Sequence, residues 1–183
     1  MKKRIKADSL VRIALGSALI SITSWISLPS PLPYTLQTFG IFFTLCLLGG
    51  KAGGLSVLVY VLMGALGFPV FSGFRGGIGV LVGATGGYIA GFILSALIFR
   101  LITLLGKDSL ISRVTGCAVG IAVCWIAGSL WYALTVTGSL TAGFVSALGV
   151  CVVPFIIPDL IKITAAVFLA EAVGRRIGRK AVR

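Results

Sequence analysis

Long apolar runs, separated by short polar, glycine-rich or proline-rich stretches, make up most of this chain. Such runs are typical of membrane helices, which need about 20 mostly apolar residues to cross a bilayer. The pattern predicts an all-α integral membrane protein with six transmembrane helices, at about residues 9–28, 39–48, 55–66, 83–105, 114–134 and 155–173. A short helix at about 140–148 is expected to lie along the outer face. The whole chain, residues 1–183, is expected to form a single membrane domain.

Two interruptions have a clear physical cause. Pro29, Pro31 and Pro33 follow the first run, and a helix cannot continue through three prolines in five residues. Residues 49–54 contain four glycines and Lys51, and they predict a tight turn between the second and third helices. This turn lacks the spacing and the Ser or Thr of a phosphate-binding P-loop.

Residues 68–82 cannot form an ordinary membrane helix. Four glycines crowd this stretch, and Arg75 stands among them. Irregular backbone is not tolerated in contact with lipid, because its N–H and C=O groups would be unpaired, but it is tolerated where it lines a cavity. We therefore expect a re-entrant or capping loop over a cavity, after which residues 83–88 begin the fourth helix.

Composition and charge exclude a soluble domain and a nucleic-acid partner. The chain is 58% hydrophobic and only 11% charged, so a soluble fold would lack polar surface. The net charge of +12 comes largely from the two ends of the chain. Basic residues stay on the cytoplasmic side of membranes. Cytoplasmic N- and C-termini place the Lys51 turn and the loop from Arg100 to Arg113 inside as well, and leave Arg75 as the one basic residue outside.

The chain offers little catalytic chemistry. Histidine is absent, and the four cysteines lie in apolar runs without a CxxC spacing. They are interpreted as small buried apolar residues rather than metal or redox ligands. No nucleophile–base pair is apparent either. We expect no metal, no cofactor and no enzymatic activity.

One acidic residue stands apart from the others. Asp8, Asp108 and Glu171 belong to the cytoplasmic side, whereas Asp159 lies in an apolar segment near the outside. Ionisable residues inside membrane segments are costly and by default indicate function. Lys162 follows three residues later, on the same helical face. Pro158 suits a first helical turn, which would place Asp159 near the positive end of the helix dipole. A purely structural ion pair is the alternative.

An outer cavity with these groups would suit a partly polar, vitamin-sized solute rather than an inorganic ion. A carboxylate would suit Arg75 or Lys162, and the pattern does not choose between them; an N–H pair would suit Asp159. Gln37, Thr85 and the amides of Gly86 and Gly87 offer further hydrogen bonds. The aromatic residues that could cover an apolar part of the ligand are Phe71, Phe74 and Tyr88.

Five motifs occur in an order that resembles a known family. They are residues 34–38, 67–71, 73–79, 83–88 and 155–162, and together they are similar to the biotin-binding S component of energy-coupling factor (ECF) transporters, the BioY family. Ala84 departs from the family's usual proline at that position. The resemblance covers nearly the whole chain, and it implies that the ligand-facing residues are Gln37, Arg75, Thr85, Tyr88, Asp159 and Lys162.

The resemblance also implies a function. The protein would capture biotin from outside a prokaryotic cell membrane, as the substrate-binding subunit of an ECF-type ABC transporter. A transmembrane T component and two cytoplasmic ATPases would drive uptake. Ala14 and Ala18, four residues apart in the first helix, would contact the T component, although their spacing alone fits packing inside the protein equally well.

Two other classes of protein remain. The first is a stand-alone secondary carrier for a small carboxylate-bearing solute, which usually has repeated halves; residues 1–90 and 91–183 show no such repeat. The second is a membrane enzyme or a purely structural membrane protein. Uptake that requires an ATPase module would favour the S component, and uptake by the chain alone would favour the carrier.

Overall fold

The computed structural model describes residues 7–28, 34–139 and 141–177. Residues 1–6 and 178–183, which carry much of the basic charge at the two ends of the chain, lie outside these ranges, as do the prolines at 29–33. The long helices are α1 (Ala7–Trp25), α2 (Gln37–Ala65), α4 (Gly86–Leu105), α5 (Leu110–Tyr132) and α7 (Val153–Arg176). The shorter elements are β1 (Ser27–Leu28), β2 (Tyr34–Thr35), a 3-10 turn (Ser72–Phe74), α3 (Ile78–Val82), a π-helical turn (Ala133–Thr137) and α6 (Thr141–Cys151).

Five helices in the described part of the chain are long and apolar enough to cross a membrane. Their outward faces are apolar as well: Leu15, Leu97 and Ile161 are each more than half exposed. A soluble helix would turn polar residues outward, so this distribution fits a lipid environment. The prediction of a multi-pass, all-α membrane protein is thus confirmed.

The helix α2 folds back on itself at Gly49. This residue has φ 78° and ψ 167°, a conformation that is not helical and that suits glycine. The side chains of Gln37 and Tyr60 are in hydrogen-bond contact at 2.7 Å, although a straight helix would separate these residues by roughly 35 Å. A Cβ atom on Gly53 would lie 2.8 Å from the Cα atom of Leu45. The two arms are therefore antiparallel, as the separate helices predicted at 39–48 and 55–66 require.

The predicted capping loop is present, but it is partly helical. Between α2 and α4 it contains the 3-10 turn and the single-turn α3. The end of α1 holds this loop: Trp25 Nε1 donates to the Pro69 carbonyl at 2.8 Å, and Ser24 Oγ donates to the Val70 carbonyl. Gly64 leaves room for the Phe71 ring, because a Cβ atom there would lie 2.0 Å from Phe71 Cζ. Side chains of α1 thus supply hydrogen bonds to two loop carbonyls, which lipid could not supply.

Three predicted helix boundaries were wrong. The helix α1 ends at Trp25 rather than 28, because Ser27 and Leu28 pair with Thr35 and Tyr34 as a two-stranded sheet; the residue before Pro29 favours extended backbone. The helix α4 begins at Gly86 rather than 83, after Thr85. The helix α5 begins at Leu110 rather than 114, because the Ser109 side chain caps it by accepting from Ser112 N–H.

The start of the last helix was also placed wrongly. The helix α7 begins at Val153, with Pro154 in its first turn, so Pro158 lies inside it. Pro158 leaves the carbonyl of Pro154 without its helical partner. Asp159 consequently lies in the second turn and gains less from the helix dipole than predicted. The short helix predicted at 140–148 is found as α6, at Thr141–Cys151.

Glycines bring α4 and α5 into close contact. A Cβ atom on Gly87 would lie 2.1 Å from Trp131 Cβ, and one on Gly91 would lie 3.0 Å from the Cα atom of Cys124. Gly128 similarly makes room for the ring of Tyr88, which would be 2.3 Å from a Cβ atom. Small residues allow helix backbones to approach closely in membranes. This packing fixes where Tyr88 lies.

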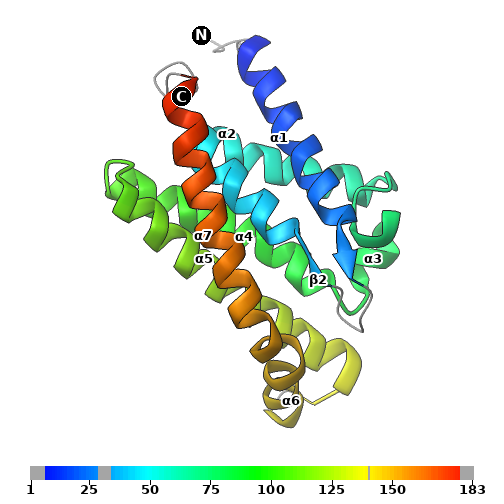
Figure 1. Cartoon of the computed structure of the whole chain (residues 1–183). Helices are drawn as coiled ribbons and strands as arrows, with labels where there is room; N and C mark the ends of the chain where they lie inside the picture. The colour runs from blue at the N-terminus through cyan, green and yellow to red at the C-terminus, as the bar shows by residue number, and fades with distance from the viewer. Residues whose placement is uncertain (1–6, 29–33, 140, 178–183) are drawn as a thin grey trace.

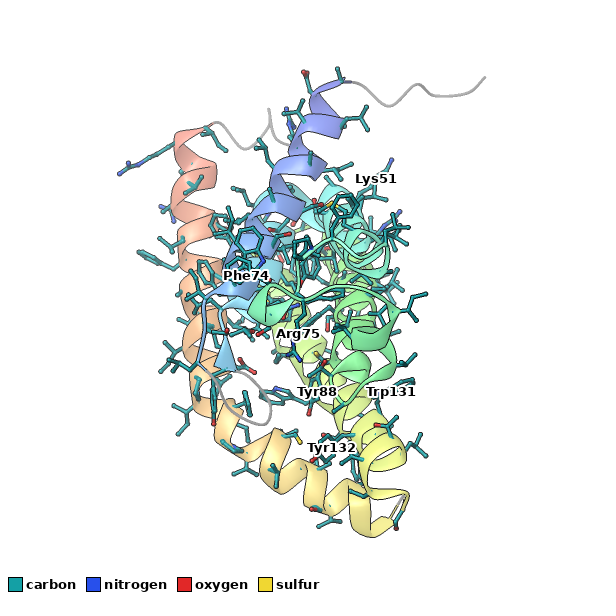
Figure 2. The ribbon with its side chains drawn as sticks, turned by 90° about the vertical axis from the view of Figure 1, so that its right-hand side faces the viewer. Lys51, Phe74, Arg75, Tyr88, Trp131 and Tyr132 are labelled. Carbon is teal, nitrogen blue, oxygen red and sulfur yellow. The ribbon has the colours of Figure 1, made fainter. Side chains whose placement is uncertain are left out.

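The two ends of the bundle differ in charge. The start of α1 and the end of α7 lie at the same end (Figure 1). Arg113 reaches Glu171 of α7, and Gly50 lies against the Arg100 backbone, so the Arg100–Arg113 turn and the Lys51 turn share this end. We call it the basic end. Figure 2 shows Lys51 near it and Tyr88, Trp131 and Tyr132 toward the opposite end.

Candidate functional site

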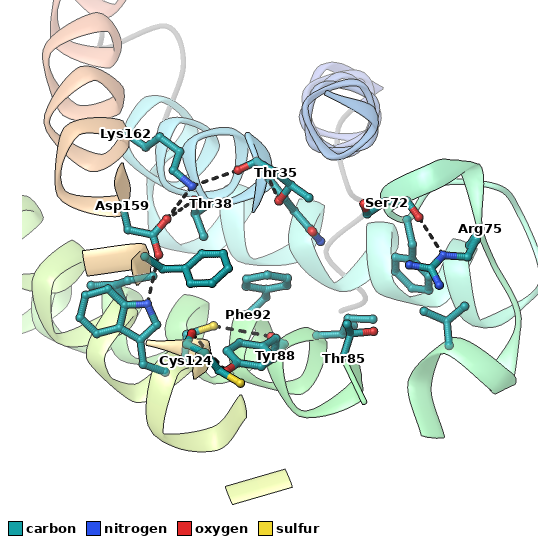
Figure 3. Close-up of a pocket in the computed structure, with 18 residues that line it drawn as sticks. Thr35, Thr38, Ser72, Arg75, Thr85, Tyr88, Phe92, Cys124, Asp159 and Lys162 are labelled. Atoms are coloured by element: carbon teal, nitrogen blue, oxygen red, sulfur yellow. Dashed lines mark hydrogen bonds and ion pairs between the residues drawn. The ribbon is translucent and has the colours of Figure 1, made fainter. Parts of the chain in front are cut away.

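Asp159 is the centre of a buried polar cluster. It is 3% exposed and lies on α7. Its Oδ1 atom is 2.6 Å from Lys162 Nζ and accepts a hydrogen bond from Thr38 Oγ1 at 3.1 Å; its Oδ2 atom accepts from Trp125 Nε1 at 3.0 Å. The donors come from α2, α5 and α7 (Figure 3). A buried carboxylate is tolerated when it is paired and hydrogen-bonded, and this one is both.

Lys162 is engaged on two sides. Besides its ion pair with Asp159, its Nζ atom donates to the backbone carbonyl of Thr35 at 3.0 Å. Thr35 belongs to β2, so this bond joins the short sheet to α7. The Lys162 side chain is 12% exposed. The Asp159–Lys162 pair thus carries no net charge. Hydrogen bonds from α2 and α5 and to β2 hold it in place.

Arg75 stands across the pocket from this pair (Figure 3). It follows the 3-10 turn of the capping loop, and its Nε atom donates to the Ser72 carbonyl at 3.1 Å. A backbone bridge from Phe71 N–H to the Arg75 carbonyl at 2.9 Å shapes this turn. No carboxylate of the described residues lies within ion-pair distance of Arg75, and its side chain is exposed. The guanidinium is therefore available to an anionic group.

An aromatic wall lies between these charged groups. Its members are Phe71, Tyr88, Phe92, Trp125 and Phe155, with Val80, Ile89 and Ile121 among them. The pocket contains about 770 Å³ of atom-free space, its open side included. Ligand pockets are lined mostly by apolar and aromatic side chains, with a few polar groups that orient the ligand. This lining suits a small organic molecule with polar ends and an apolar middle.

Gln37 contributes an amide to the same pocket. It is 7% exposed, and its Nε2 atom donates to the Tyr60 hydroxyl at 2.7 Å. The Tyr60 ring meets the Phe71 ring edge to face, with centroids 5.5 Å apart. Phe71 itself lines the pocket. Contacts with the second arm of α2 and with the capping loop thus hold the Gln37 side chain in place.

The structure brings all six predicted ligand residues to one pocket: Gln37, Arg75, Thr85, Tyr88, Asp159 and Lys162. Two subsidiary expectations were wrong. Phe74 does not line the pocket; it is 63% exposed and stacks on Trp25 at 5.0 Å. The amide of Gly86 already donates to the Gly83 carbonyl at 3.0 Å, and neither Gly86 nor Gly87 lines the pocket.

Sequence reasoning missed Trp125. Its indole N–H meets Asp159, although the two residues lie on different helices and far apart in sequence. One signal pointed to it: a tryptophan in the middle of a membrane helix carries a donor that needs a partner when it is buried. Asp159 was the one acidic residue predicted to lie in an apolar segment, and it was therefore the candidate partner.

Ala14 and Ala18 lie apart from the pocket, on the outward face of α1. Both are exposed, whereas Gly16 and Ser17 on the opposite face are buried against α2. Ser17 Oγ donates to the Ser56 carbonyl at 2.9 Å across that interface. The α1–α2 contact thus uses the other side of the helix and leaves the two alanines uncovered.

The described residues contain no group of three or more His, Cys, Asp or Glu that could hold a metal. The four cysteines are buried, and Cys46 and Cys117 approach within 3.6 Å between their sulfur atoms. Their burial fits the predicted role as small apolar residues.

A multi-pass helical protein with an aromatic pocket between opposite charges has the features of a membrane-embedded binding protein for a small solute. Comparison with known proteins narrows this class. The model of the BioY family matches residues 1–179, and the chain therefore belongs to the BioY family. The family resemblance predicted from the sequence is confirmed.

Several relatives support this assignment. The biotin transporter BioY of Thermotoga maritima is 38% identical over 165 residues, which cover 88% of this chain and 92% of the relative. The probable biotin transporter BioY of Pyrococcus horikoshii is 39% identical over 91% of this chain and 96% of its own. These relatives are transporters, which agrees with the predicted non-enzymatic function.

A solved structure has the same fold. The crystal structure of the S-component for biotin from an ECF-type ABC transporter superposes with a TM-score of 0.81. The match covers 96% of this chain and 95% of the other, at 24% sequence identity. The bundle described above is thus an S-component fold.

Proposed function

We propose that this protein is the substrate-binding subunit of an ECF-type ABC transporter and that it captures biotin from outside the cell. One observation carries the proposal: Asp159 and Arg75 lie on opposite sides of one pocket, with aromatic side chains between them. Biotin has the matching order of groups, with ureido N–H donors, an apolar bicycle and a carboxylate tail. The names of the relatives support the same ligand.

The contacts favour one orientation of the ligand. Asp159 is the acceptor for a ureido N–H, because an ionised carboxylate accepts hydrogen bonds and donates none. Lys162 is already bound to Asp159 and to the Thr35 carbonyl. Arg75 has a single hydrogen bond, from Nε, which leaves its terminal nitrogens for the carboxylate tail. Arg75 is therefore the cation that we assign to the tail.

The same proposal includes a topology. The two arms of α2 each count as a membrane segment, which gives six crossings with α1, α4, α5 and α7. The basic end would face the cytoplasm of a prokaryotic cell, together with both termini. The capping loop and α6 would then lie outside, and residues 1–183 would act as one membrane domain.

Transport would depend on partners. A T component would pack on the exposed Ala14 and Ala18, because small residues let another helix approach closely. Two cytoplasmic ATPases would supply the energy. The competing function is a stand-alone secondary carrier for a small carboxylate-bearing solute.

Uptake of labelled biotin tests this division of roles. The chain is expressed in cells that lack their own biotin uptake, with or without a T component and its ATPases. We expect uptake that needs the module and that is lost in the double variant Ala14→Leu/Ala18→Leu, while biotin binding by that variant is retained. Ala118→Leu is the matched control, since Ala118 is an exposed alanine on α5. Full uptake by the chain alone would instead support the carrier.

A further inference from the structure

Asp159 has little accepting capacity left for a ligand. An ionised carboxylate has about four lone-pair positions, two on each oxygen. Lys162 and Thr38 occupy the two positions on Oδ1, and Trp125 occupies one on Oδ2. The remaining position is on Oδ2, beside the indole. A ligand N–H that enters without displacing a protein donor therefore meets Asp159 next to Trp125.

Trp125 also connects two helices that share few other contacts. The helix α5 packs mainly on α4, and α7 packs mainly on α2. Among the described residues, the other polar link between α5 and α7 is the Arg113–Glu171 ion pair at the basic end. The position of the Asp159 carboxylate relative to the α5 side of the pocket thus depends on the Trp125 hydrogen bond.

We propose that Trp125 is a positioning residue that determines specificity for an N–H-bearing ligand head group, such as a cyclic urea. Its indole N–H only donates, so it holds Oδ2 of Asp159 and turns the last lone pair of the carboxylate toward the pocket. This inference rests on the proposed binding function and adds a selectivity role for a residue on α5. Trp125 acts through Asp159 rather than through a hydrogen bond of its own to the ligand.

The first test is Trp125→Phe, which keeps an aromatic ring and removes the N–H donor. We expect biotin affinity, measured by calorimetry on the purified full chain, to fall about tenfold, as for the loss of a hydrogen bond to a charged group. Trp131→Phe is the matched control. Trp131 lies on the same helix and donates to the Gly83 carbonyl at 2.9 Å. Its variant should keep an affinity close to that of the wild type.

A double-mutant cycle separates positioning from simple packing. If Trp125 acts through Asp159, then Trp125→Phe causes no further loss in an Asp159→Asn background. Losses that add in full would mean that the indole contacts the ligand independently, and they would overturn the inference. Wild-type affinity in Trp125→Phe would overturn it too.

A second variant guards against misfolding. Replacement of Trp125 by 3-benzothienylalanine keeps the shape of the indole and exchanges its N–H for sulfur. The same loss of affinity, about tenfold, is expected, and cooperative thermal unfolding of the variant would show that it is folded. If the wild type itself fails to bind biotin, the proposed function fails and this inference falls with it. If the wild type binds biotin and the Trp125 variants bind it equally well, only the role of Trp125 is rejected.

Discussion

Two buried ion-pair clusters, one at each half of the bundle, show different uses of charge in a membrane protein. At the basic end, Arg113 is 2% exposed and bonds through all three nitrogens: Nε to Asp108 Oδ1 at 2.7 Å, Nη1 to Glu171 Oε1 at 2.6 Å and Nη2 to the Asp108 carbonyl at 2.9 Å. At the other cluster, Asp159 and Lys162 are equally well paired but border a pocket.

Burial and pairing alone do not identify a ligand site. Both clusters satisfy the requirement that buried charges be compensated. The Arg113 cluster joins the α4–α5 turn to α7 and is interpreted as a structural clamp. The Asp159 cluster differs in three ways: one lone pair of the carboxylate is unoccupied, aromatic side chains lie beside it, and Arg75 faces it across the pocket. The cavity, rather than the ion pair, distinguishes the two.

The largest effect is expected on stability, from Arg113→Met. This change removes the cation that two carboxylates share, and breaking a buried ion pair costs about 3–5 kcal/mol. Unfolding of the purified protein in detergent should show this loss, whereas the folded fraction should bind biotin as the wild type does. Arg100→Met is the control, because Arg100 is exposed near the same turn. Unchanged stability of Arg113→Met would contradict the structural role of this cluster.

The next largest effect is expected on binding, from Asp159→Asn. The amide keeps the shape but loses the charge, and biotin affinity should fall by more than about tenfold. Titration calorimetry measures it. Asp108→Asn is the counterpart in the other cluster and should leave affinity unchanged. Near wild-type affinity in Asp159→Asn would remove this residue from the site.

A smaller effect is expected from Arg75→Gln, because Arg75 is exposed and water screens its interactions. Biotin affinity should fall about two- to fivefold, as for an exposed ion pair. Biotinamide, which lacks the negative charge, should bind the variant and the wild type equally. An equal loss for both ligands would show that Arg75 does not contact the carboxylate. In that case Lys162 becomes the candidate.

Local chemistry in the sequence predicted much of this architecture. The glycines near residue 49 predicted the reversal within α2, and the rarity of acidic residues singled out Asp159. The Gly-rich segment with Arg75 predicted a loop over a cavity, and the structure places Arg75 beside the pocket. These features follow from backbone conformation and from the cost of charge in lipid, both of which are readable residue by residue.

Tertiary contacts account for what the sequence did not predict. Trp125 meets Asp159 only because α5 and α7 pass the same pocket, and a single sequence does not contain that proximity. Phe74 resembled a pocket residue by its position in the loop, but stacking on Trp25 turns it away. Pro158 resembled a helix start, whereas Pro154 already occupies the first turn of α7. Proline is favoured at the first helical position, but it can also stand inside a helix, where it removes one backbone hydrogen bond.

We propose that this chain forms a biotin site without its partners. Equilibrium titration of the purified, detergent-solubilised wild type with biotin tests it most directly, with thiamine and riboflavin as controls. We expect saturable, tight binding of biotin and no binding of thiamine or riboflavin. A folded sample that shows no binding of biotin would contradict it, and the pocket between Asp159 and Arg75 would then belong to another amphiphilic solute.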